Sequence, residues 1–469
     1  MLARYLEKIM KKQMRPARQA RGQVLIVVAL SLVVLIGAVG LAIDSGLGFI
    51  VRAKLNAAVD SASIAAARAV TQGVGQDAQR ASAQAAAQKF FTANFPSGYL
   101  GAIPTFNNPT ITFNGGMVTV DAAATATVPV TLMRVLGFNL LTVSASAETI
   151  RKDLDLSFVM DTSGSMAPVG ANVISSAQLF LTQFNPSQDR MALIHFAYGA
   201  QVDTPINTVA RGFNQAAMNT AIGKYVFNGL TNSAEGMWNG RDQLNSIALA
   251  NRSSLRVIVF FSDGSPNTIA SVFKFKTPSD CTTPGSLVTG DGTTTGTPDG
   301  LWLMNQQGTQ MSGKCYQGAN IVKNLDPAAL PLWYNAHNPT NLPALQEFPI
   351  ITATPRSVTN DTSSNAATWI NVNRASRNLL EAMAAKARSE GIYVFTLGLG
   401  SDLTTANGPP PSDKGEDILK CMANTSDALS RCVTAGAGQP VGIYCYAATA
   451  DGLKPCFEQL ASAILRISM

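Results

Sequence analysis

The sequence predicts an α/β fold, in which a doubly wound parallel-sheet domain follows a transmembrane helix and a small α+β module. The chain has 469 residues, enough for two or three domains. One early stretch is apolar and uncharged, and from residue 153 onward short apolar runs alternate with helical patterns. The expected regions are a basic cytoplasmic tail at 1–22, a transmembrane helix at 23–43, a stalk and linking module at 44–150, and the α/β domain at 151–469 with an insertion at 265–373.

Composition and charge exclude two classes of protein. Hydrophobic residues make up 46% of the chain and charged residues 14%, so the chain can bury a core and is not globally disordered. The net charge is +6, and residues 1–22 alone hold seven basic residues and one acidic residue. The remaining chain is therefore formally neutral, which argues against a nucleic-acid partner.

The apolar stretch from Val24 to Ile43 predicts a membrane span. Its 20 residues include 14 Val, Leu or Ile residues, and at 1.5 Å per residue a helix of this length covers ~30 Å, the thickness of a bilayer core. The branched residues favour insertion by ~6 kcal/mol. A buried core helix is the alternative. A cleaved signal sequence would be shorter and followed by small residues at a cleavage site, so we expect an uncleaved anchor.

The basic residues give the orientation of this single span. Seven precede it, whereas only Arg52 and Lys54 fall in the 20 residues after it. The amino terminus should therefore be cytoplasmic and the bulk of the chain exported. All six cysteines lie on the exported side, which predicts disulfides, although fifteen pairings are possible. A zinc site is disfavoured, because the sequence has no CxxC motif and only His195 and His337.

Residues 44–150 predict helices and a hairpin. Residues 45–91 are rich in alanine and interrupted near Gly73–Gly75, which indicates one or two helices. Residues 111–130 alternate in polarity around a Gly-Gly pair, which is typical of a hairpin.

The run RGQVLIVVALSLVVLIGAVGLAIDSGLGFIVRAKLNAAVDSASIAAARA, with the later VPVTLMRVLGFNLLTVSASAET, resembles TadG-like proteins of the bacterial Tad (Flp) pilus-assembly system over residues 20–150. The resemblance implies a protein of the bacterial inner (cytoplasmic) membrane whose bulk is periplasmic or extracellular. Prepilin-like relatives in this system carry a glutamate five residues after a processed Arg-Gly pair. Here that position is Val27, so we expect no processing after Gly22.

The α/β domain is predicted from four buried strands, LDLSFVMD, RMALIHFA, LRVIVFFSD and GIYVFTLGLG. Asp161, Ser163 and Ser165 follow the first strand. Asp263 ends the third strand, and Thr231 lies in a loop before it. Because ligands of such sheets bind beyond the carboxyl ends of the strands, these hard oxygen donors predict a site for Mg²⁺ or Mn²⁺.

This set resembles the metal-ion-dependent adhesion site of von Willebrand factor A domains, which has the pattern Asp-x-Ser-x-Ser, a distant Thr and a distant Asp. The resemblance covers residues 151–469 and fills all five positions. It implies that Ser163, Ser165 and Thr231 bind the ion through their hydroxyls. Asp161 and Asp263 would act mainly through bound water and hydrogen bonds, and a partner's carboxylate would take the open position.

The insertion at 265–373 is long for such a domain and rich in Thr, Gly, Pro and Asn. It leaves the carboxyl end of a strand, so it should emerge on the face that carries the metal loops. Cys281 and Cys315 are its only cysteines, and we expect them to pair, which would add about 3 to 4 kcal/mol of stability. A tolerated surface insertion is the alternative.

No enzyme is predicted, because GxSxG, HExxH and the phosphate-loop pattern are absent from the sequence. His195 lies inside an apolar run, which is typical of a hydrogen-bonded core histidine. Two hypotheses remain. The first is an assembly or anchoring protein of a Tad-type pilus, with pilus-assembly proteins as partners. The second is a metal-dependent surface adhesin that binds an acidic ligand presenting a carboxylate.

Overall fold

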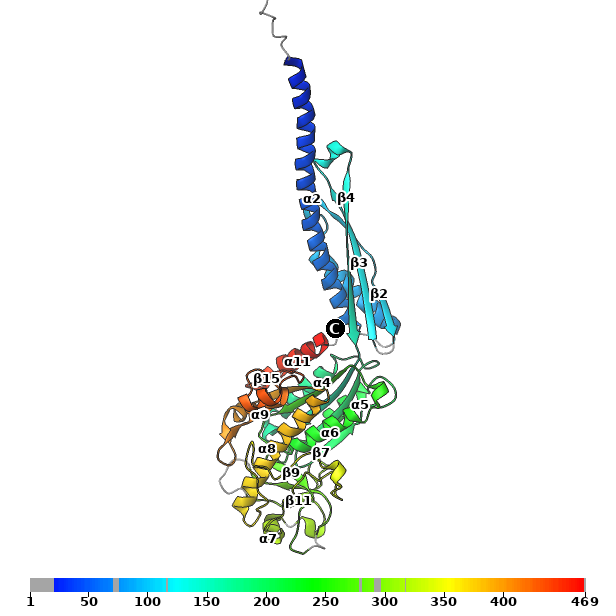
Figure 1. The fold of residues 1–469 in the computed structure, drawn as a ribbon. Coiled ribbons are helices and arrows are strands. Elements are labelled where there is room, and N and C mark those ends of the chain that lie inside the picture. Colours follow the sequence, from blue (N-terminus) through cyan, green and yellow to red (C-terminus); the bar gives the residue numbers. More distant parts are fainter. Residues whose placement is uncertain are drawn as a thin grey trace, which may run out of the picture. The chain divides into compact units, whose positions relative to one another are not determined.

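The computed structural model describes residues 21–70, 76–114, 117–277, 281–290, 297–316 and 318–467 (Figure 1). The chain forms two compact units. The amino-terminal module takes its residues from 1–66, 83–111 and 120–149, and the α/β domain takes the rest. The basic tail expected at 1–22 lies almost entirely outside the described residues.

The amino-terminal module pairs two helices with a small antiparallel sheet. The elements are α2 (Arg21–Ala69), α3 (Gln76–Asn94), η1 (Tyr99–Gly101), β1 (Ile103–Phe106), β2 (Thr110–Asn114), β3 (Met117–Pro129), η2 (Met133–Leu136) and β4 (Leu140–Lys152). The strand order is β1-β3-β2, and β4 also pairs with β3. The predicted hairpin is confirmed as β2 and β3, with its Gly-Gly pair outside the described residues.

Helix α2 changes character along its length. Val51, Leu55, Ala58 and Ala62 are fully buried, and their spacing of three and four residues places them on one face. In contrast, most side chains between Val24 and Ile43 are exposed. Among the described residues, this is the one helix long and apolar enough to cross a membrane, as an anchor or a signal sequence would be.

The α/β domain contains a six-stranded sheet in the order β15-β12-β8-β5-β6-β7. Its strands are β5 (Leu154–Asp161), β6 (Arg190–Phe196), β7 (Ala200–Thr204), β8 (Leu255–Ser262), β12 (Tyr393–Leu399) and β15 (Tyr444–Ala447). Four neighbouring pairs are parallel, whereas β7 runs antiparallel to β6. The predicted parallel sheet is thus confirmed with one antiparallel edge strand, which a short turn after β6 permits.

Two hydrophobic cores cover the two faces of this sheet. Along β5, Leu156 and Phe158 pack in one core, and Val159 packs in the other, as the alternation of side chains along a strand requires. Helices α4 (Gly170–Leu181), α5 (Gln215–Ile222) and α11 (Leu453–Ile467) line the first face, and α6 (Ser233–Asn245), α8 (Asn365–Ser389) and α9 (Gly415–Ala423) line the second.

The segment after β8 adds a second small sheet. It contains β9 (Thr268–Ser271), β10 (Gly285–Val288), β11 (Leu301–Trp302), η5 (Gly313–Cys315), η6 (Gly318–Asn320), α7 (Ile321–Asn324) and η7 (Pro343–Leu345). Leu287, Leu301 and Ile321 are fully buried in the same core as α6 and α8. The insertion is therefore part of the domain's core and not a surface excursion.

Helix α8 begins at Asn365, earlier than the expected end of the insertion at residue 373. Its first turn is capped by Ser364, whose hydroxyl accepts a hydrogen bond from the backbone N–H of Ala367 at 3.1 Å. The predicted Cys281–Cys315 disulfide is confirmed, and Cys421–Cys432 and Cys445–Cys456 form two more.

The remaining short elements of the domain lie in the connections between these strands and helices. They are η3 (Gly164–Val169), η4 (Leu249–Asn251), η8 (Ser401–Thr404), β13 (Ala406–Asn407), β14 (Asp413–Lys414), α10 (Ser430–Ala435) and η9 (Ala450–Gly452).

Candidate metal centre

The five predicted site residues lie at the carboxyl end of the central sheet. Asp161 is the last residue of β5, and Asp263 directly follows the neighbouring parallel strand β8. Ser163 and Ser165 lie at the start of η3, and Thr231 lies just before α6. Carboxyl ends of adjacent parallel strands meet at one edge, so the topology brings these loops together.

A chain of hydrogen bonds connects four of the five residues. The backbone N–H of Ser163 donates to Asp161 Oδ1 at 2.8 Å. The hydroxyls of Ser163 and Ser165 are 3.2 Å apart, and the Ser165 hydroxyl donates to Asp263 Oδ1 at 2.9 Å. Ser163 occupies the N-cap position of η3, but its side chain makes no capping hydrogen bond to that helix. Capping therefore does not occupy the Ser163 hydroxyl.

Thr231 joins the group through its position beside Gly264. A Cβ atom at Gly264 would lie 3.7 Å from Thr231 Oγ1, which places this hydroxyl next to the residue that follows Asp263. The loop is held by Asn267, whose Oδ1 accepts from the Thr231 N–H at 2.9 Å. The structure thus brings all five predicted side chains to one place.

The two carboxyl groups are buried close to each other. Asp161 is fully buried and Asp263 is 8% exposed. Burial raises the pKa of Asp161 to about 6, against the opposing effect of hydrogen bonds from Ser262 and Ser163. Burial, and then the neighbouring Asp161 carboxylate, raise the pKa of Asp263 well above its usual range, and Asp402 adds to this effect.

These residues fit a hard divalent cation. Within the described residues, no ion pair joins Asp161, Asp263 or Asp402 to a basic side chain. Hydroxyl and carboxylate oxygens are the donors that Mg²⁺ and Mn²⁺ prefer. Ser165 is exposed whereas Asp161 and Ser163 are buried, so the group opens to solvent on the Ser165 side.

Three residues near the site were not predicted from the sequence. The Ser262 hydroxyl donates to Asp161 Oδ2 at 2.6 Å, Asn267 holds the Thr231 loop, and Asp402 affects the pKa of Asp263. Ser262 is the last residue of β8 and Asp402 lies shortly after β12, so the rule that ligands bind at the carboxyl ends of strands could have found them.

The insertion reaches these loops, as predicted from its departure point. Gln307 Nε2 donates to the carbonyl oxygen of Thr162, which lies between two site residues, at 3.4 Å. Trp302 stacks on Tyr198 with ring centroids 3.8 Å apart. The insertion therefore packs on the face that carries the candidate site.

Two other groups of residues do not provide a reactive centre. His195 Nδ1 lies 2.7 Å from Asp203 Oδ2, and its ring is almost fully buried, which confirms the predicted core histidine. Glu381, Cys421 and Cys432 lie close enough to share an ion. The two sulfurs form a disulfide in this structure, so they offer no thiolate.

Comparisons with known families match both parts of the chain. The von Willebrand factor type A domain model matches residues 156–265. The model described as putative Flp pilus-assembly TadE/G-like matches residues 22–69. No curated protein matches the chain at a significant level.

Solved structures show only a distant likeness. The pilus adhesin SpaC from Lactobacillus rhamnosus GG is 15% identical over 78% of this chain and 35% of its own, with a TM-score of 0.37. The PilB minor pilin from Streptococcus sanguinis is 12% identical over 79% and 80%, with a TM-score of 0.35. Proximal thread matrix protein 1 from the mussel byssus, with a zinc-occupied MIDAS motif, is 12% identical over 67% and 46%, with a TM-score of 0.32.

The chain spans about a third of the length of SpaC and less than half of the byssus protein. These scores are too low to transfer any property of those proteins. The family matches instead agree with the order of elements, a long apolar helix followed by a small antiparallel module and a mostly parallel sheet. The chain is therefore a TadG-like protein, with a Tad-type amino-terminal segment joined to a von Willebrand factor type A domain.

Proposed function

We propose that this protein is a membrane-anchored, extracytoplasmic assembly or anchoring protein of a Tad (Flp) type pilus, and that its α/β domain binds a protein partner through a divalent cation. The observation that carries the proposal is the group at the end of the central sheet. Two buried carboxyl groups there meet three hydroxyls, and no basic side chain among the described residues forms an ion pair with either carboxyl group. Such a group lowers its free energy by taking up a cation.

The proposed ion is Mg²⁺ or Mn²⁺. The hydroxyls of Ser163, Ser165 and Thr231 would hold it, and Asp161 and Asp263 would supply the negative charge. A bound ion provides a Lewis-acidic position for an oxygen ligand. Ser165 is the exposed member of the set, which favours a ligand that approaches from solvent. A carboxylate on a partner protein has the charge and the oxygen donor that this position requires.

The proposed topology follows from helix α2 and the basic residues before it. An uncleaved single-pass anchor with a cytoplasmic amino terminus would export the α/β domain and its three disulfides to an oxidising compartment. Protease added to spheroplasts should then digest the exported domains and leave the basic tail protected. A mature chain that begins at Gln23 would contradict the uncleaved anchor.

The function is tested with Asp263→Ala in cells that carry the rest of the pilus machinery. We expect normal protein levels and loss of pilus assembly. Ser175→Ala is the matched control, because Ser175 is an exposed serine on α4 away from the site, and it should leave pili unchanged. If pili form normally but cells no longer attach to a surface, the alternative of a metal-dependent adhesin is correct. If neither output changes, the metal group has no role in either function.

A further inference from the structure

The turn at the tip of the β3–β4 hairpin is fixed to helix α2. The Asp44 carboxylate, which is 1% exposed, accepts hydrogen bonds from the backbone N–H groups of Thr131, Leu132 and Met133 at 3.2, 3.0 and 2.8 Å. It also accepts from the Thr131 hydroxyl at 2.9 Å. Four hydrogen bonds to one buried carboxylate hold this turn at a defined position along the helix axis.

The hairpin also packs closely against α2 about one helical turn before Asp44 and one helical turn after it. A Cβ atom at Gly40 would lie 2.6 Å from Leu132 Cβ, and one at Gly48 would clash with Leu141 Cδ2. Gly40, Asp44 and Gly48 are four residues apart and so share one face of α2. The two glycines allow the hairpin to approach the helix backbone along this face.

These contacts define the position of the turn along the axis of α2. Gly40 lies three residues before Ile43, the last residue of the uncharged apolar stretch. At 1.5 Å per residue, Leu132 therefore packs against α2 at a point about 4.5 Å inside that stretch. If α2 crosses a bilayer, this point lies at the exported boundary between headgroups and acyl chains.

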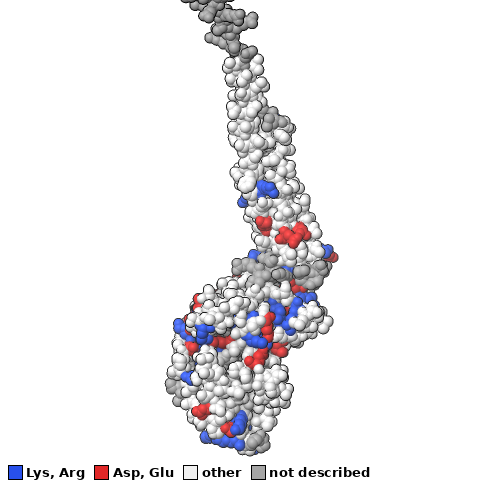
Figure 2. Space-filling view, viewed as in Figure 1, with Lys and Arg blue, Asp and Glu red and all other residues white. Residues whose placement is uncertain are grey.

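The surface near the turn is suited to that boundary. Phe138 and Leu140 are 54% and 61% exposed, and Phe49 on α2 is 74% exposed. Arg134 is the only charged residue between residues 131 and 140, and it is exposed. On the face drawn in Figure 2, the apolar part of α2 is free of blue and red, and charged residues first appear further along the module.

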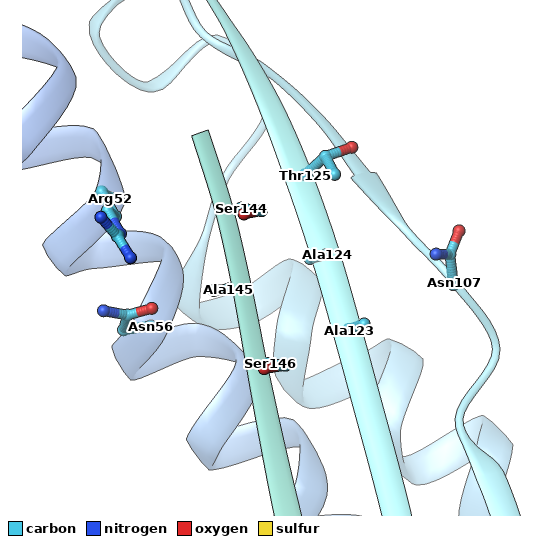
Figure 3. Close-up of a pocket in the computed structure, with 9 residues that line it drawn as sticks. All are labelled: Arg52, Asn56, Asn107, Ala123, Ala124, Thr125, Ser144, Ala145 and Ser146. Carbon is cyan, nitrogen blue, oxygen red and sulfur yellow. The ribbon is translucent and has the colours of Figure 1, made fainter. Parts of the chain in front are cut away.

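The groove farther along the same module is polar. A cavity of about 370 Å³ lies between α2 and the strands (Figure 3). Arg52 and Asn56 line it from the helix, and Ser144 and Ser146 line it from β4. The character of the surface thus changes from apolar to polar within about one helical turn after Gly48. A lipid boundary explains this change better than a protein partner covering the whole module.

We propose that the turn at residues 131–140 is a second membrane contact, which inserts Phe138 and Leu140 into the interfacial layer of the bilayer that α2 crosses and places Arg134 against lipid phosphates. The inference rests on the proposed function of α2 as an anchor. Aromatic and aliphatic side chains partition into this layer, and arginine extends its charged end to the headgroups. Two contacts restrict the tilt and the depth of α2 in the bilayer more than a single helix does.

The test uses the full-length protein in vesicles of phosphatidylcholine and phosphatidylglycerol. Phe138→Trp adds a tryptophan at an exposed position, and the four native tryptophans all lie beyond residue 230. Lipids brominated near the headgroup end of the acyl chain should quench most of the added emission, and lipids brominated near the bilayer centre should quench less. Leu249→Trp, at an 81% exposed position of the α/β domain, is the control and should show no quenching.

The outcomes separate this inference from the anchor itself. Wild-type protein that alkaline washing removes from the vesicles would overturn both. Protein that stays with the vesicles while the added tryptophan of Phe138→Trp is quenched no more than that of Leu249→Trp would overturn the second contact alone. A photo-crosslinking residue at position 138 gives an independent reading. Adducts with lipid support the proposal, whereas adducts with a second copy or another protein contradict it.

Discussion

Strand β5 has a buried acidic residue near each end, and the two residues differ in their hydrogen-bond partners. Asp155 near its amino end and Asp161 at its carboxyl end are both fully buried. Asp155 accepts hydrogen bonds from the guanidinium groups of Arg190 and Arg211 at 3.4 and 3.0 Å. Among the described residues, Asp161 accepts hydrogen bonds from the Ser163 N–H and the Ser262 hydroxyl, and its carboxylate raises the pKa of the neighbouring Asp263.

This difference in partners indicates that the two ends of β5 have different roles. A buried carboxylate that the chain neutralises with its own arginines needs nothing from solution, so it is a structural group. Ser253 also donates to Asp155 through its N–H at 2.7 Å and its hydroxyl at 2.9 Å. A buried pair of carboxyl groups without such partners is stable only if it is protonated or binds a cation. The comparison therefore separates an end of β5 whose acid is neutralised by the chain itself from the end at which we propose that an ion binds.

The largest expected effect comes from making one substitution at both ends. Asp155→Asn should destabilise the domain by about 3 to 5 kcal/mol, because it leaves two arginines around a neutral group. Asp161→Asn in metal-free buffer should cost far less, because it removes a buried charge that has no basic partner. Urea unfolding of the full chain in detergent, followed by the native tryptophans, measures both. Equal losses for the two variants would contradict the distinction between the two ends.

The second prediction concerns the ion. Mg²⁺ at a hundred times its dissociation constant should stabilise the wild-type domain by about 2.7 kcal/mol, because only the folded state presents the site. Asp263→Asn should abolish this gain, and Asp155→Asn should keep it despite a lower starting stability. Thermal unfolding with and without Mg²⁺, together with titration calorimetry, checks both statements. Unchanged calorimetry for Asp161→Ala and Asp263→Ala would exclude the site.

Central strands were predictable from the sequence, whereas edge strands were not. The run LDLSFVMD coincides with β5, and three other apolar runs contain β6, β8 and β12. These strands are covered on both faces and so read as continuous apolar segments. Edge strands β7 and β15 are short and partly exposed, so their sequences carry no comparable signal. The start of α8 was missed for a different reason, because polar side chains such as Asn371 and Asn373 are buried there and interrupt the apolar pattern of a buried helix.

The clustering of the five candidate residues was predictable because each lies at the end of a strand or before a helix of a recognisable pattern. The role of Asp44 was not predictable. It lies at the end of the apolar stretch like an ordinary boundary residue, and its partners lie 87 to 89 residues away in the sequence. Nothing local to Asp44 or to Thr131 indicates that they meet. Contacts that depend on how a hairpin lies against a helix become visible only once the fold is known.

The smallest expected effect concerns Asp153, which shares the Arg211 guanidinium with Asp155. Asp153 is intermediate between Asp155 and Asp161 in how well its charge is compensated. Arg211 Nη2 lies 2.7 Å from Asp153 Oδ2, yet burial outweighs this partner and raises the pKa of Asp153 to about 6. Between about pH 4 and pH 6 the folded state therefore holds a proton that the unfolded state releases. Ionisation of Asp153 thus lowers stability as the pH rises through this window, and below it the group makes no difference.

The expected slope is below about 1.4 kcal/mol per pH unit, the limit for one proton, because the folded and unfolded states never differ by a whole proton at any one pH. Asp153→Asn cannot ionise, so its stability relative to the wild type should increase from pH 4 to pH 6 and then level off. Urea unfolding of both proteins across this range gives the difference directly and cancels the titration of all other groups. A difference that falls with rising pH would mean that Arg211 outweighs burial, and Asp153 would then belong with Asp155 among the neutralised acids of the amino end.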